Sequence, residues 1–260
     1  MNVAVIGGNG YLGTHVADYF CAARLSRRVG FDITQKNLSS NLKDYEVIIH
    51  MAALVDKSEK EYEEVLRVNA EGTRNLTMSL NSTQTLIFTS TKDVYDQFTA
   101  YATSKRIAEE YVNYYSKKIG FKSGVFRLST TYAPPTNGST FVNKFASLIR
   151  EHKELSLLMK GKQIRDFLYV DDLSEAFKKF IESDIHNATY DIGGGLKNSM
   201  TMEDLARTIS MELRIEPIIK YSDKPVTGQI DYVTNLNKIT KELGWVPKTT
   251  IPEGIKRIIN

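Results

Sequence analysis

The sequence has little cysteine, little net charge and no long apolar run. Cys21 is the only cysteine among 260 residues, so no disulfide can form within the chain. We expect Cys21 to be a small buried hydrophobe on the apolar side of the first helix. The formal net charge is +3 and the basic residues are dispersed, which argues against a nucleic-acid partner. No run reaches the length of a membrane span and nothing ahead of the first apolar run resembles a signal peptide, so we expect a cytoplasmic protein without a membrane partner.

Histidine is also scarce, with four in the chain. His15 and His50 lie near the elements discussed below, and neither has a carboxylate or a cysteine at ligand spacing. We therefore expect structural roles for both histidines and no metal site.

The remaining sequence alternates between short β-prone runs and helical ones. Strands are predicted at 3–6, 46–50, 85–89 and 123–128, and helices at 14–23, 61–80 and 101–118. Near-continuous apolar strands separated by helices are typical of a parallel sheet that is covered on both faces. The predicted fold class is therefore α/β.

The pattern loosens after the proline-containing break at residues 133–138. We predict a first domain over residues 1–133 and a smaller C-terminal α/β lobe over residues 134–260. Helices are predicted in the lobe region at 139–152, 172–183, 202–213 and 236–243. A strand near 188–192 is expected to return to the sheet of the first domain.

A glycine-rich turn follows the first strand. Gly7, Gly10 and Gly13 stand three residues apart, ahead of a helix that we expect from Thr14. This spacing allows a tight turn, a close backbone approach to a pyrophosphate and close helix packing. The N-terminus of the helix would add N–H groups and the positive end of its dipole. A dinucleotide site in a Rossmann-type doubly wound sheet is favoured over a purely structural turn.

Tyr101 and Lys105 form the clearest candidate catalytic pair. Four residues apart on a helix, they share one face, and a neighbouring ammonium is expected to lower the pKa of the tyrosine. Tyr101 would then act as an acid or base near neutral pH, and Thr91 could bond the same substrate oxygen. The alternative is an ordinary surface tyrosine and lysine on an amphipathic helix.

Further motifs extend this pattern along the chain. They are His50-Met51-Ala52-Ala53, Asn69-Ala70-Glu71-Gly72-Thr73-Arg74-Asn75-Leu76, Ser90-Thr91-x-x-Val94-Tyr95, Arg165-Asp166-Phe167-Leu168-Tyr169-Val170-Asp171-Asp172 and Leu243-Gly244-Trp245-Val246-Pro247. With the glycine turn and Tyr101-x-x-x-Lys105, they resemble the extended short-chain dehydrogenase/reductases of the nucleotide-sugar epimerase/dehydratase type. The resemblance covers nearly the whole chain.

The resemblance implies that Thr91, Tyr101 and Lys105 are catalytic. Tyr101 would exchange a proton with the C4 oxygen of a sugar, while Lys105 would bind the nicotinamide ribose and tune Tyr101. Arg165 would hold a nucleotide diphosphate, unless it forms an ion pair with a neighbour such as Asp166. Asp93 and Thr130 are expected near the substrate. The residues expected at the cofactor are Gly7, Asn9, Gly10, Tyr11, Leu12, Gly13, Arg27, Arg28, Asp32, Ile33, Met51, Ala52, Ala53, Asn69, Tyr101 and Lys105.

Three departures from the family pattern concern the substrate. Only residues 96–100 separate Tyr95 from Tyr101, where relatives carry a longer loop, so the pocket would be more open or differently shaped. Lys92 stands where the dehydratases have an acid, which argues against water elimination. Thr130 replaces an asparagine that contacts the nucleotide, which weakens the nucleotide-sugar assignment.

The region around Asp32 leaves NAD and NADP open as cofactors. In one register, Asp32 lies nineteen positions after Gly13 and holds the adenosine ribose of NAD. In the other, Asp32 and Ile33 lie by the adenine, while Arg27 and Arg28 hold the 2′-phosphate of NADP. We favour NADP, although the two arginines would also suit a solvated basic turn.

The main functional prediction is an NAD(P)-dependent 4-epimerase of a nucleotide sugar, which removes hydride at C4 and returns it. The first alternative is an NADPH-dependent reductase of a nucleotide 4-keto-sugar, resembling dTDP-4-dehydrorhamnose reductase. Residues 53–59 and the short region around Asp32 favour this alternative. The second is a non-catalytic NAD(P)-binding regulator, against which the joint presence of Thr91, Tyr101 and Lys105 argues. The resemblance also implies a homodimer through the helices at 61–80 and 101–118.

Overall fold

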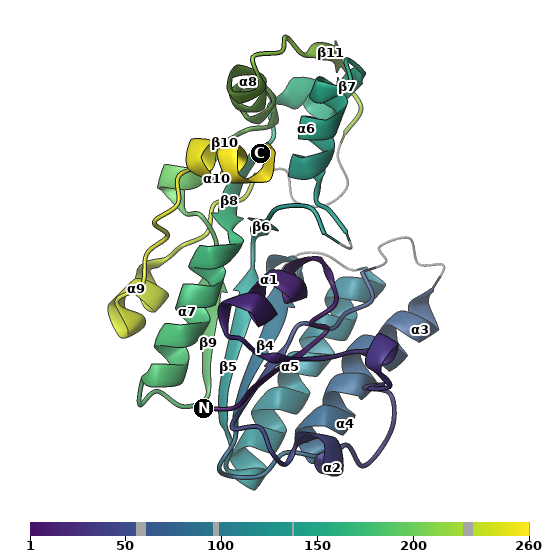
Figure 1. Ribbon diagram of the computed structural model, residues 1–260, viewed down its shortest axis with the longest axis vertical. Helices are drawn as coiled ribbons and strands as arrows, with labels where there is room; N and C mark the ends of the chain where they lie inside the picture. Colours follow the sequence, from purple (N-terminus) through teal and green to yellow (C-terminus); the bar gives the residue numbers. More distant parts are fainter. Residues whose placement is uncertain (56–60, 96–98, 137, 226–230, 260) are drawn as a thin grey trace. The chain divides into compact units, whose positions relative to one another are not determined.

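The computed structural model describes residues 1–55, 61–95, 99–136, 138–225 and 231–259. The chain forms two compact units, which are drawn in Figure 1. The first consists of Met1–Leu128 and Ser174–Asp191, and the second of Ser129–Leu173 and Ile192–Asn260. The first unit thus ends at Leu128 rather than at residue 133, and it regains a helical stretch and a strand from later in the sequence.

The first unit is built on a six-stranded sheet in the order β2-β1-β3-β4-β5-β9. The strands are β1 (Val3–Ile6), β2 (Ala23–Leu25), β3 (Val47–His50), β4 (Thr85–Thr91), β5 (Lys122–Leu128) and β9 (Ala188–Ile192). β1 pairs in parallel with β2 and β3, and β4 pairs in parallel with β3 and β5. The predicted parallel α/β sheet is confirmed, and β9 lies beside β5.

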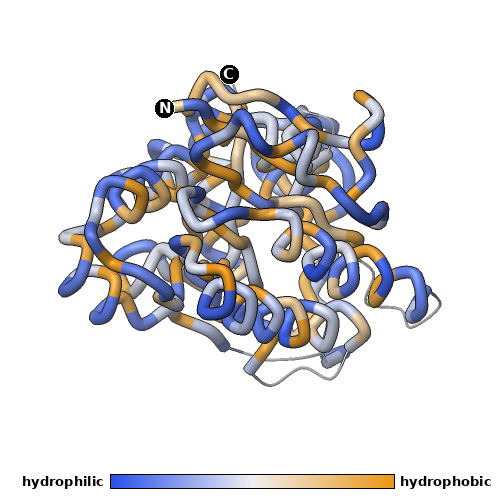
Figure 2. The backbone as a smooth tube through the Cα atoms, turned by 90° about the horizontal axis from the view of Figure 1, so that it is seen from below, coloured by the Kyte–Doolittle hydropathy of each residue, from blue (hydrophilic) through white to orange (hydrophobic). Residues whose placement is uncertain are grey.

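Helices cover both faces of this sheet. They are α1 (Tyr11–Tyr19), α2 (Ser39–Leu42), α3 (Tyr62–Leu66), α4 (Gly72–Met78), α5 (Ala100–Ile119) and α7 (Val170–Glu182). On one face Phe88 of β4 packs in a cluster with Ala108 and Val112 of α5. On the other, the ring centroids of Phe126 and Phe177 lie 4.9 Å apart. The coils of the helices alternate apolar and polar segments, as Figure 2 shows, because each helix buries only one side.

Helix α5 carries the predicted catalytic pair and has well-defined ends. The hydroxyl of Thr99 accepts a hydrogen bond from the N–H of Ala102 and so caps the first turn. Gly120 ends the helix with φ of +97°, a conformation that glycine adopts without steric cost. These ends fix the register in which Tyr101 and Lys105 face β4.

Two predicted helices differ from the observed ones. The first begins at Tyr11 rather than Thr14 and stops at Tyr19, and Ala23 belongs to β2. The prediction that Cys21 is buried on a helix face is wrong, because the chain turns after α1 and leaves Cys21 exposed with φ of +48°. The predicted helix at 61–80 contains a π-turn, η2 (Arg67–Glu71), between α3 and α4.

The second unit contains a three-stranded sheet and a separate strand pair. The sheet has the order β10-β8-β6, with β6 (Thr130–Tyr132), β8 (Ile164–Tyr169) and β10 (Ser199–Thr201). β7 (Glu154–Leu157) pairs in parallel with β11 (Ile218–Tyr221). The helices are α6 (Phe141–Arg150), α8 (Met202–Leu213), α9 (Asn237–Leu243) and α10 (Ile251–Ile259), of which the last was not predicted.

Two buried carboxylates join segments of the second unit. Asp166 accepts hydrogen bonds from the hydroxyl of Ser129 and from the N–H groups of Gly195 and Thr234. Asp172 accepts the Thr249 N–H at 2.8 Å through its carboxylate. The indole of Trp245 donates to the Asp172 carbonyl at 3.0 Å. Together these contacts tie the C-terminal segments to β8 and to the start of α7.

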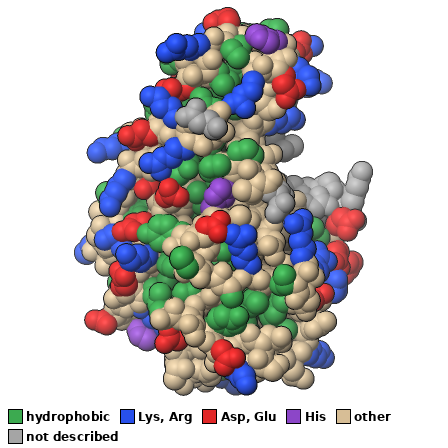
Figure 3. All heavy atoms as spheres, viewed as in Figure 1, with side chains coloured by type: hydrophobic (Ala, Val, Ile, Leu, Met, Phe, Trp, Pro, Cys, Tyr) green, Lys and Arg blue, Asp and Glu red, His purple; other side chains and the backbone are tan. Residues whose placement is uncertain are grey.

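Acidic and basic side chains are interspersed on the face shown in Figure 3, in keeping with the dispersed charge of the sequence. Among the described residues, no helix combines the length and apolar character needed to span a bilayer.

Candidate functional site

The glycine-rich turn closes tightly between β1, α1 and the end of β3. Gly7 has φ of +84°, and a Cβ there would lie 2.6 Å from the nitrogen of Ala52. A Cβ on Gly13 would lie 2.1 Å from the carbonyl oxygen of Gly7. Only glycine fits at either position, because no backbone atom can move by that amount without opening the turn.

The turn leads directly into α1. Thr14 makes the first helical bond, from its N–H to the Gly10 carbonyl at 3.0 Å. Tyr11, Leu12 and Gly13 therefore form the first turn, whose N–H groups point towards the N-terminal end of the helix. This end of the helix has the positive dipole that favours an anion.

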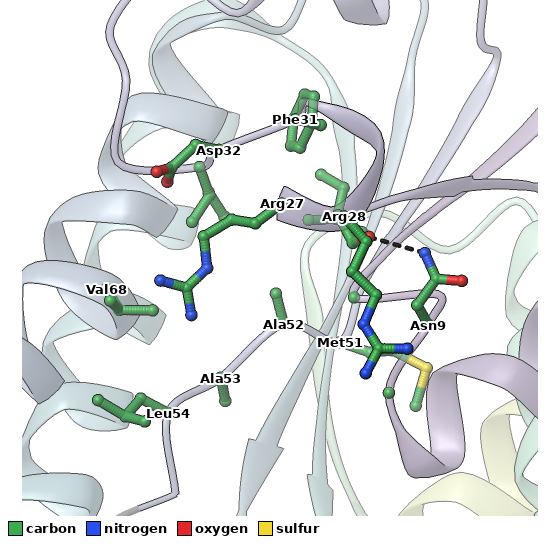
Figure 4. A pocket seen from close by; sticks show the side chains of 15 residues that line it. Asn9, Arg27, Arg28, Phe31, Asp32, Met51, Ala52, Ala53, Leu54 and Val68 are labelled. Atoms are coloured by element: carbon green, nitrogen blue, oxygen red, sulfur yellow. Dashed lines mark hydrogen bonds between the residues drawn. The ribbon is translucent and has the colours of Figure 1, made fainter. Parts of the chain in front are cut away.

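A pocket of about 330 Å³ opens beside this turn, and Figure 4 shows its lining. Ten of the predicted cofactor residues line it, namely Gly7, Asn9, Gly10, Arg27, Arg28, Asp32, Ile33, Met51, Ala52 and Ala53. It is also lined by Ile6, Ser26, Phe31, Leu54 and Val68, which sequence reasoning did not select. Ser26 and Phe31 were missed because β2, which sets the position of both, is only three residues long.

The polar side of the pocket is basic. The side chains of Arg27 and Arg28 both extend along it in Figure 4. Ser26, rather than an acid, follows the end of β2, and its hydroxyl accepts a hydrogen bond from Asn9 at 2.7 Å. The Asp32 carboxylate accepts hydrogen bonds from the N–H and hydroxyl of Thr34 at 2.9 and 2.8 Å. These bonds, with the charge of Arg27, lower the pKa of Asp32.

Asn69 stands behind the pocket wall and does not line it. Its amide accepts from the N–H of Leu54 at 2.8 Å and donates to the Leu54 carbonyl at 2.9 Å. It also donates to the hydroxyl of Ser104 on α5 at 3.0 Å. Asn69 therefore holds the loop that follows β3 in place against α5.

Thr91 and Tyr101 are brought together at the carboxyl end of β4. Their side chains are hydrogen-bonded, and this bond alone would lower the pKa of Tyr101. Desolvation and the charge of Asp93 act more strongly, so the pKa of Tyr101 is raised. The predicted lowering of this pKa by Lys105 is thus wrong, because desolvation of the phenol and the charge of Asp93 both raise it.

Lys105 is buried on the same face of α5. Its Nζ donates to the Thr89 carbonyl at 2.8 Å and lies 4.7 Å from the ring centroid of Phe88. Burial lowers the pKa of Lys105 to about 7, against the opposing charge of Glu109. An amine with that pKa exchanges a proton readily near neutral pH.

Lys92 and Asp93 form a buried ion pair next to Thr91. The distance from Lys92 Nζ to Asp93 Oδ1 is 3.2 Å, and the side chains are 9% and 6% exposed. The N–H of Asp93 donates to the hydroxyl of Thr91 at 3.2 Å. The pair therefore sets the charge next to the Thr91 and Tyr101 hydroxyls.

The predicted substrate residues Thr130 and Arg165 both belong to the second unit. Thr130 lies on β6 opposite Phe167, and Arg165 lies on β8 opposite Met200. Successive side chains of a strand point to opposite faces, so Arg165 and Asp166 face away from each other. The short loop predicted to reshape the pocket includes residues 96–98, which lie outside the described part of the chain.

His50 ends β3 and is fully buried. Its Nε2 lies 3.0 Å from the hydroxyl of Thr73, and burial together with the nearby Lys105 holds its pKa well below the usual value. His50 is therefore a neutral core residue. Among the described residues, no cluster of three or more histidine, cysteine or acidic side chains is placed to bind a metal ion.

Known proteins share both the sequence pattern and the fold. Residues 3–193 match the sequence profile of the group described as "NAD dependent epimerase/dehydratase family". The chain is 26% identical to a putative UDP-glucose 4-epimerase of Methanocaldococcus jannaschii, over 99% of this chain and 97% of that protein. It is also 26% identical to dTDP-D-glucose 4,6-dehydratase of Bos taurus, over 99% of this chain and 87% of that protein.

A solved structure with the same fold is MoeE5 in complex with UDP-glucose and NAD. Its TM-score is 0.90 at 20% sequence identity, and the match covers 100% of this chain and 97% of that chain. At this identity the likeness establishes the fold, a mostly parallel sheet with flanking helices.

Proposed function

The chain belongs to the NAD-dependent epimerase/dehydratase family, whose members are enzymes, and we propose that it is an NAD(P)-dependent 4-epimerase of a nucleotide sugar. The observation that carries the proposal is the hydrogen bond between Thr91 and Tyr101, with Lys105 one turn further along α5. These three side chains can hold and move a proton at the hydroxyl of a sugar.

A dinucleotide fits the residues of the first unit. The turn at Gly7 and Gly13 leaves no room for a Cβ, and such a turn lets a pyrophosphate approach the backbone. The first turn of α1 directs its N–H groups and dipole to the same place. Ala52, Ala53 and Leu54 then provide an apolar wall of the pocket.

Tyr101 would handle the proton at C4. Because its pKa is raised, its hydroxyl keeps the proton at neutral pH and can donate it to a C4 oxygen. When the C4 hydroxyl is oxidised, Tyr101 in its phenolate form accepts the hydroxyl proton while Thr91 holds the same oxygen. Lys105, with a pKa of about 7, would stabilise the phenolate in its charged form. The nicotinamide, when bound, supplies the acceptor and the donor of the hydride.

The Lys92–Asp93 ion pair supports epimerisation over dehydration. Water elimination needs an acid and a base in addition to Tyr101, and Lys92 replaces one of the carboxylates that the dehydratases carry. The remaining carboxylate of Asp93 has an ammonium 3.2 Å away. A paired carboxylate is a weak base, because the cation stabilises its ionised form.

Tyr101→Phe tests the proposed chemistry. We expect kcat for C4 epimerisation of UDP-sugars, followed by NMR of the product, to fall by roughly 10³-fold with cofactor affinity unchanged. Tyr114→Phe, at an exposed position of the same helix, is the matched control. Unchanged turnover in Tyr101→Phe would remove the proposed role, and a wild-type protein that binds cofactor without turnover would favour the non-catalytic regulator.

A reductase is the second candidate function. Residues 53–59 form the motif that favours a reductase. Of these, residues 56–59 lie outside the described part of the chain. The two reactions differ in net cofactor use, since an epimerase returns its hydride to the sugar. Steady loss of absorbance at 340 nm with a 4-keto-sugar nucleotide would establish a reductase instead.

The basic lining of the pocket supports NADP as the cofactor, although the family is NAD-dependent. Arg27 and Arg28 follow β2, where an acid would be needed to accept hydrogen bonds from both hydroxyls of the adenosine ribose of NAD. Asp32 already accepts two hydrogen bonds from Thr34. Two guanidinium groups beside Ser26 would instead bind a 2′-phosphate.

Replacing both arginines by serine tests this preference. We expect the Kd of NADP⁺ to rise by roughly 10- to 100-fold and that of NAD⁺ to change by less than about threefold. Arg24→Ser is the control, because Arg24 pairs with Asp18 and does not line the pocket. Tighter binding of NAD⁺ than of NADP⁺ by the wild-type protein would exclude the preference.

A further inference from the structure

Glu109 joins α5 to the strand that carries Thr91. It lies one turn after Lys105 on α5, and its side chain is only 11% exposed. Its carboxylate accepts from the hydroxyl of Ser90 at 2.5 Å. Ser90 directly precedes Thr91, so this bond fixes β4 against α5 beside the proposed catalytic hydroxyls.

Arg127 of β5 completes the attachment. Its Nε and Nη2 donate to Glu109 at 3.0 and 2.6 Å, which is the two-point geometry that an arginine fork makes with a carboxylate. Its Nη1 donates to the hydroxyl of Tyr95 at 2.8 Å. The guanidinium carbon also lies 4.8 Å from the centroid of the Tyr95 ring.

Tyr95 is anchored on its other side as well. Its hydroxyl donates to both carboxylate oxygens of Asp191 on β9, at 2.7 and 2.8 Å. One residue earlier, the carbonyl of Val94 accepts a hydrogen bond from Nε of Arg106 on α5. The segment from Ser90 to Tyr95 is therefore held at its start and at its end by the same charged group, Arg127 with Glu109.

This segment contains the residues that act on Tyr101. Thr91 is hydrogen-bonded to the phenol, and Asp93 is the charged group that faces it. Glu109 and Tyr101 lie on the same helix, two turns apart. Movement of the segment relative to α5 would change the distance between the Thr91 and Tyr101 hydroxyls.

We propose that Arg127 is a positioning residue, which with Glu109, Tyr95 and Asp191 clamps the segment Ser90–Tyr95 so that Thr91 stays in register with Tyr101. The proposal rests on the proposed function for its effect on turnover. None of the clamp residues lines the pocket beside the glycine turn. The clamp therefore acts on the chemical step and leaves cofactor binding unchanged.

The chain offers a matched control for the clamp. Arg207, Glu203 and Tyr221 form another arginine–glutamate–tyrosine group in the second unit, with Arg207 and Tyr221 both donating to Glu203 at 2.7 Å. The Arg207 side chain is 54% exposed, against 24% for Arg127. Arg207→Gln therefore removes the same kind of contact at a site without catalytic residues.

Hydrogen exchange tests the clamp independently of activity. In Arg127→Gln, and more weakly in Tyr95→Phe, we expect amide exchange of residues 90–95 to accelerate by at least roughly 10-fold, with no change there in Arg207→Gln. Tyr95→Phe keeps the Arg127–Glu109 pair, so this variant still tests the clamp if Arg127→Gln does not fold. Unchanged exchange in this segment for both clamp variants would overturn the proposal.

A double-mutant cycle tests the link to turnover. We expect Arg127→Gln to lower kcat by roughly 10-fold in the wild-type background but by less than about twofold in Thr91→Ala, with cofactor Kd constant in both. Equal losses in the two backgrounds would indicate a general structural role and overturn positioning. Full activity of Tyr101→Phe would instead count against the proposed function, while the exchange experiment would still decide on the clamp.

Discussion

Lys105→Met should stabilise the protein while abolishing turnover. Lys105 is 2% exposed, and burial lowers its pKa from the ordinary value of 10.5 to about 7. Each pKa unit corresponds to about 1.4 kcal/mol, so keeping this ammonium charged in the folded state costs up to about 5 kcal/mol below pH 7. Methionine fills a similar volume without a charge, but it leaves the Thr89 carbonyl without its donor, which costs about 1–3 kcal/mol. The expected net gain is about 2–4 kcal/mol at pH 6.

The pH dependence of this gain follows from the direction of the shift. Between pH 7 and 10.5 the unfolded chain holds a proton on Lys105 that the folded protein has lost. The stability of the wild-type protein therefore rises with pH across this window, by about 1.4 kcal/mol per unit from this group alone. Lys105→Met lacks this rise, so its advantage should shrink from pH 7 upwards and vanish by about pH 10.

Urea unfolding followed by far-UV circular dichroism at pH 6, 8 and 10 measures the difference, since other titrating groups cancel between the two proteins. Lys117→Met, at an exposed position of the same helix, should show a flat difference across the range. A Lys105→Met protein less stable than the wild type at pH 6, or a stability difference that does not change with pH, would refute the lowered pKa of the buried Lys105 amine. Retained turnover in Lys105→Met would refute its functional role.

Two further substitutions test the turn and the second unit. Gly13→Ala should cost about 2–4 kcal/mol of stability or raise the cofactor Kd more than 10-fold, because the added Cβ meets the Gly7 carbonyl. Gly30 has φ of +80° with open space around it, so the control Gly30→Ala should cost only about 1 kcal/mol of stability in thermal unfolding. Asp166→Asn should destabilise the second unit by about 2–4 kcal/mol, because the hydrogen bonds from Ser129, Gly195 and Thr234 then go to a neutral amide and lose their charge assistance. The fluorescence of the buried Trp245, the only tryptophan, follows that unfolding, and Asp223→Asn, at an exposed ion pair, should differ from the wild type by less than about 0.5 kcal/mol. An Asp166→Asn protein as stable as Asp223→Asn would show that the buried bonds contribute little.

The sequence predicted what depends on local pattern. The spacing of Gly7, Gly10 and Gly13 predicts a closed turn, which the structure has. The apolar run Val3–Ile6 predicts a strand covered on both faces, and all four of its residues are buried in β1. The four-residue spacing of Tyr101 and Lys105 likewise places them on one side of α5. These features are set within a few residues, so they can be recognised without the fold.

What escaped prediction depends on contacts between distant residues. β2 is three partly buried residues that pair with β1, so nothing in its own sequence separates it from the end of a helix. The pKa of Tyr101 was expected to follow Lys105, but Lys105 donates to the Thr89 carbonyl and Asp93 faces the phenol. The clamp of Glu109 and Arg127 unites two elements that sequence spacing does not relate.

The π-turn between α3 and α4 gives this helix one residue more than a regular α-helix needs. Val65 before the turn and Leu76 after it are both completely buried. A π-turn holds one residue more than the α-helical turn that it replaces, so deleting one residue from Arg67–Glu71 would restore regular α-helix and keep both side chains on the buried face. It would also displace Asn69 from the loop that it holds. Such a deletion should therefore leave the helix folded while releasing the loop that follows β3.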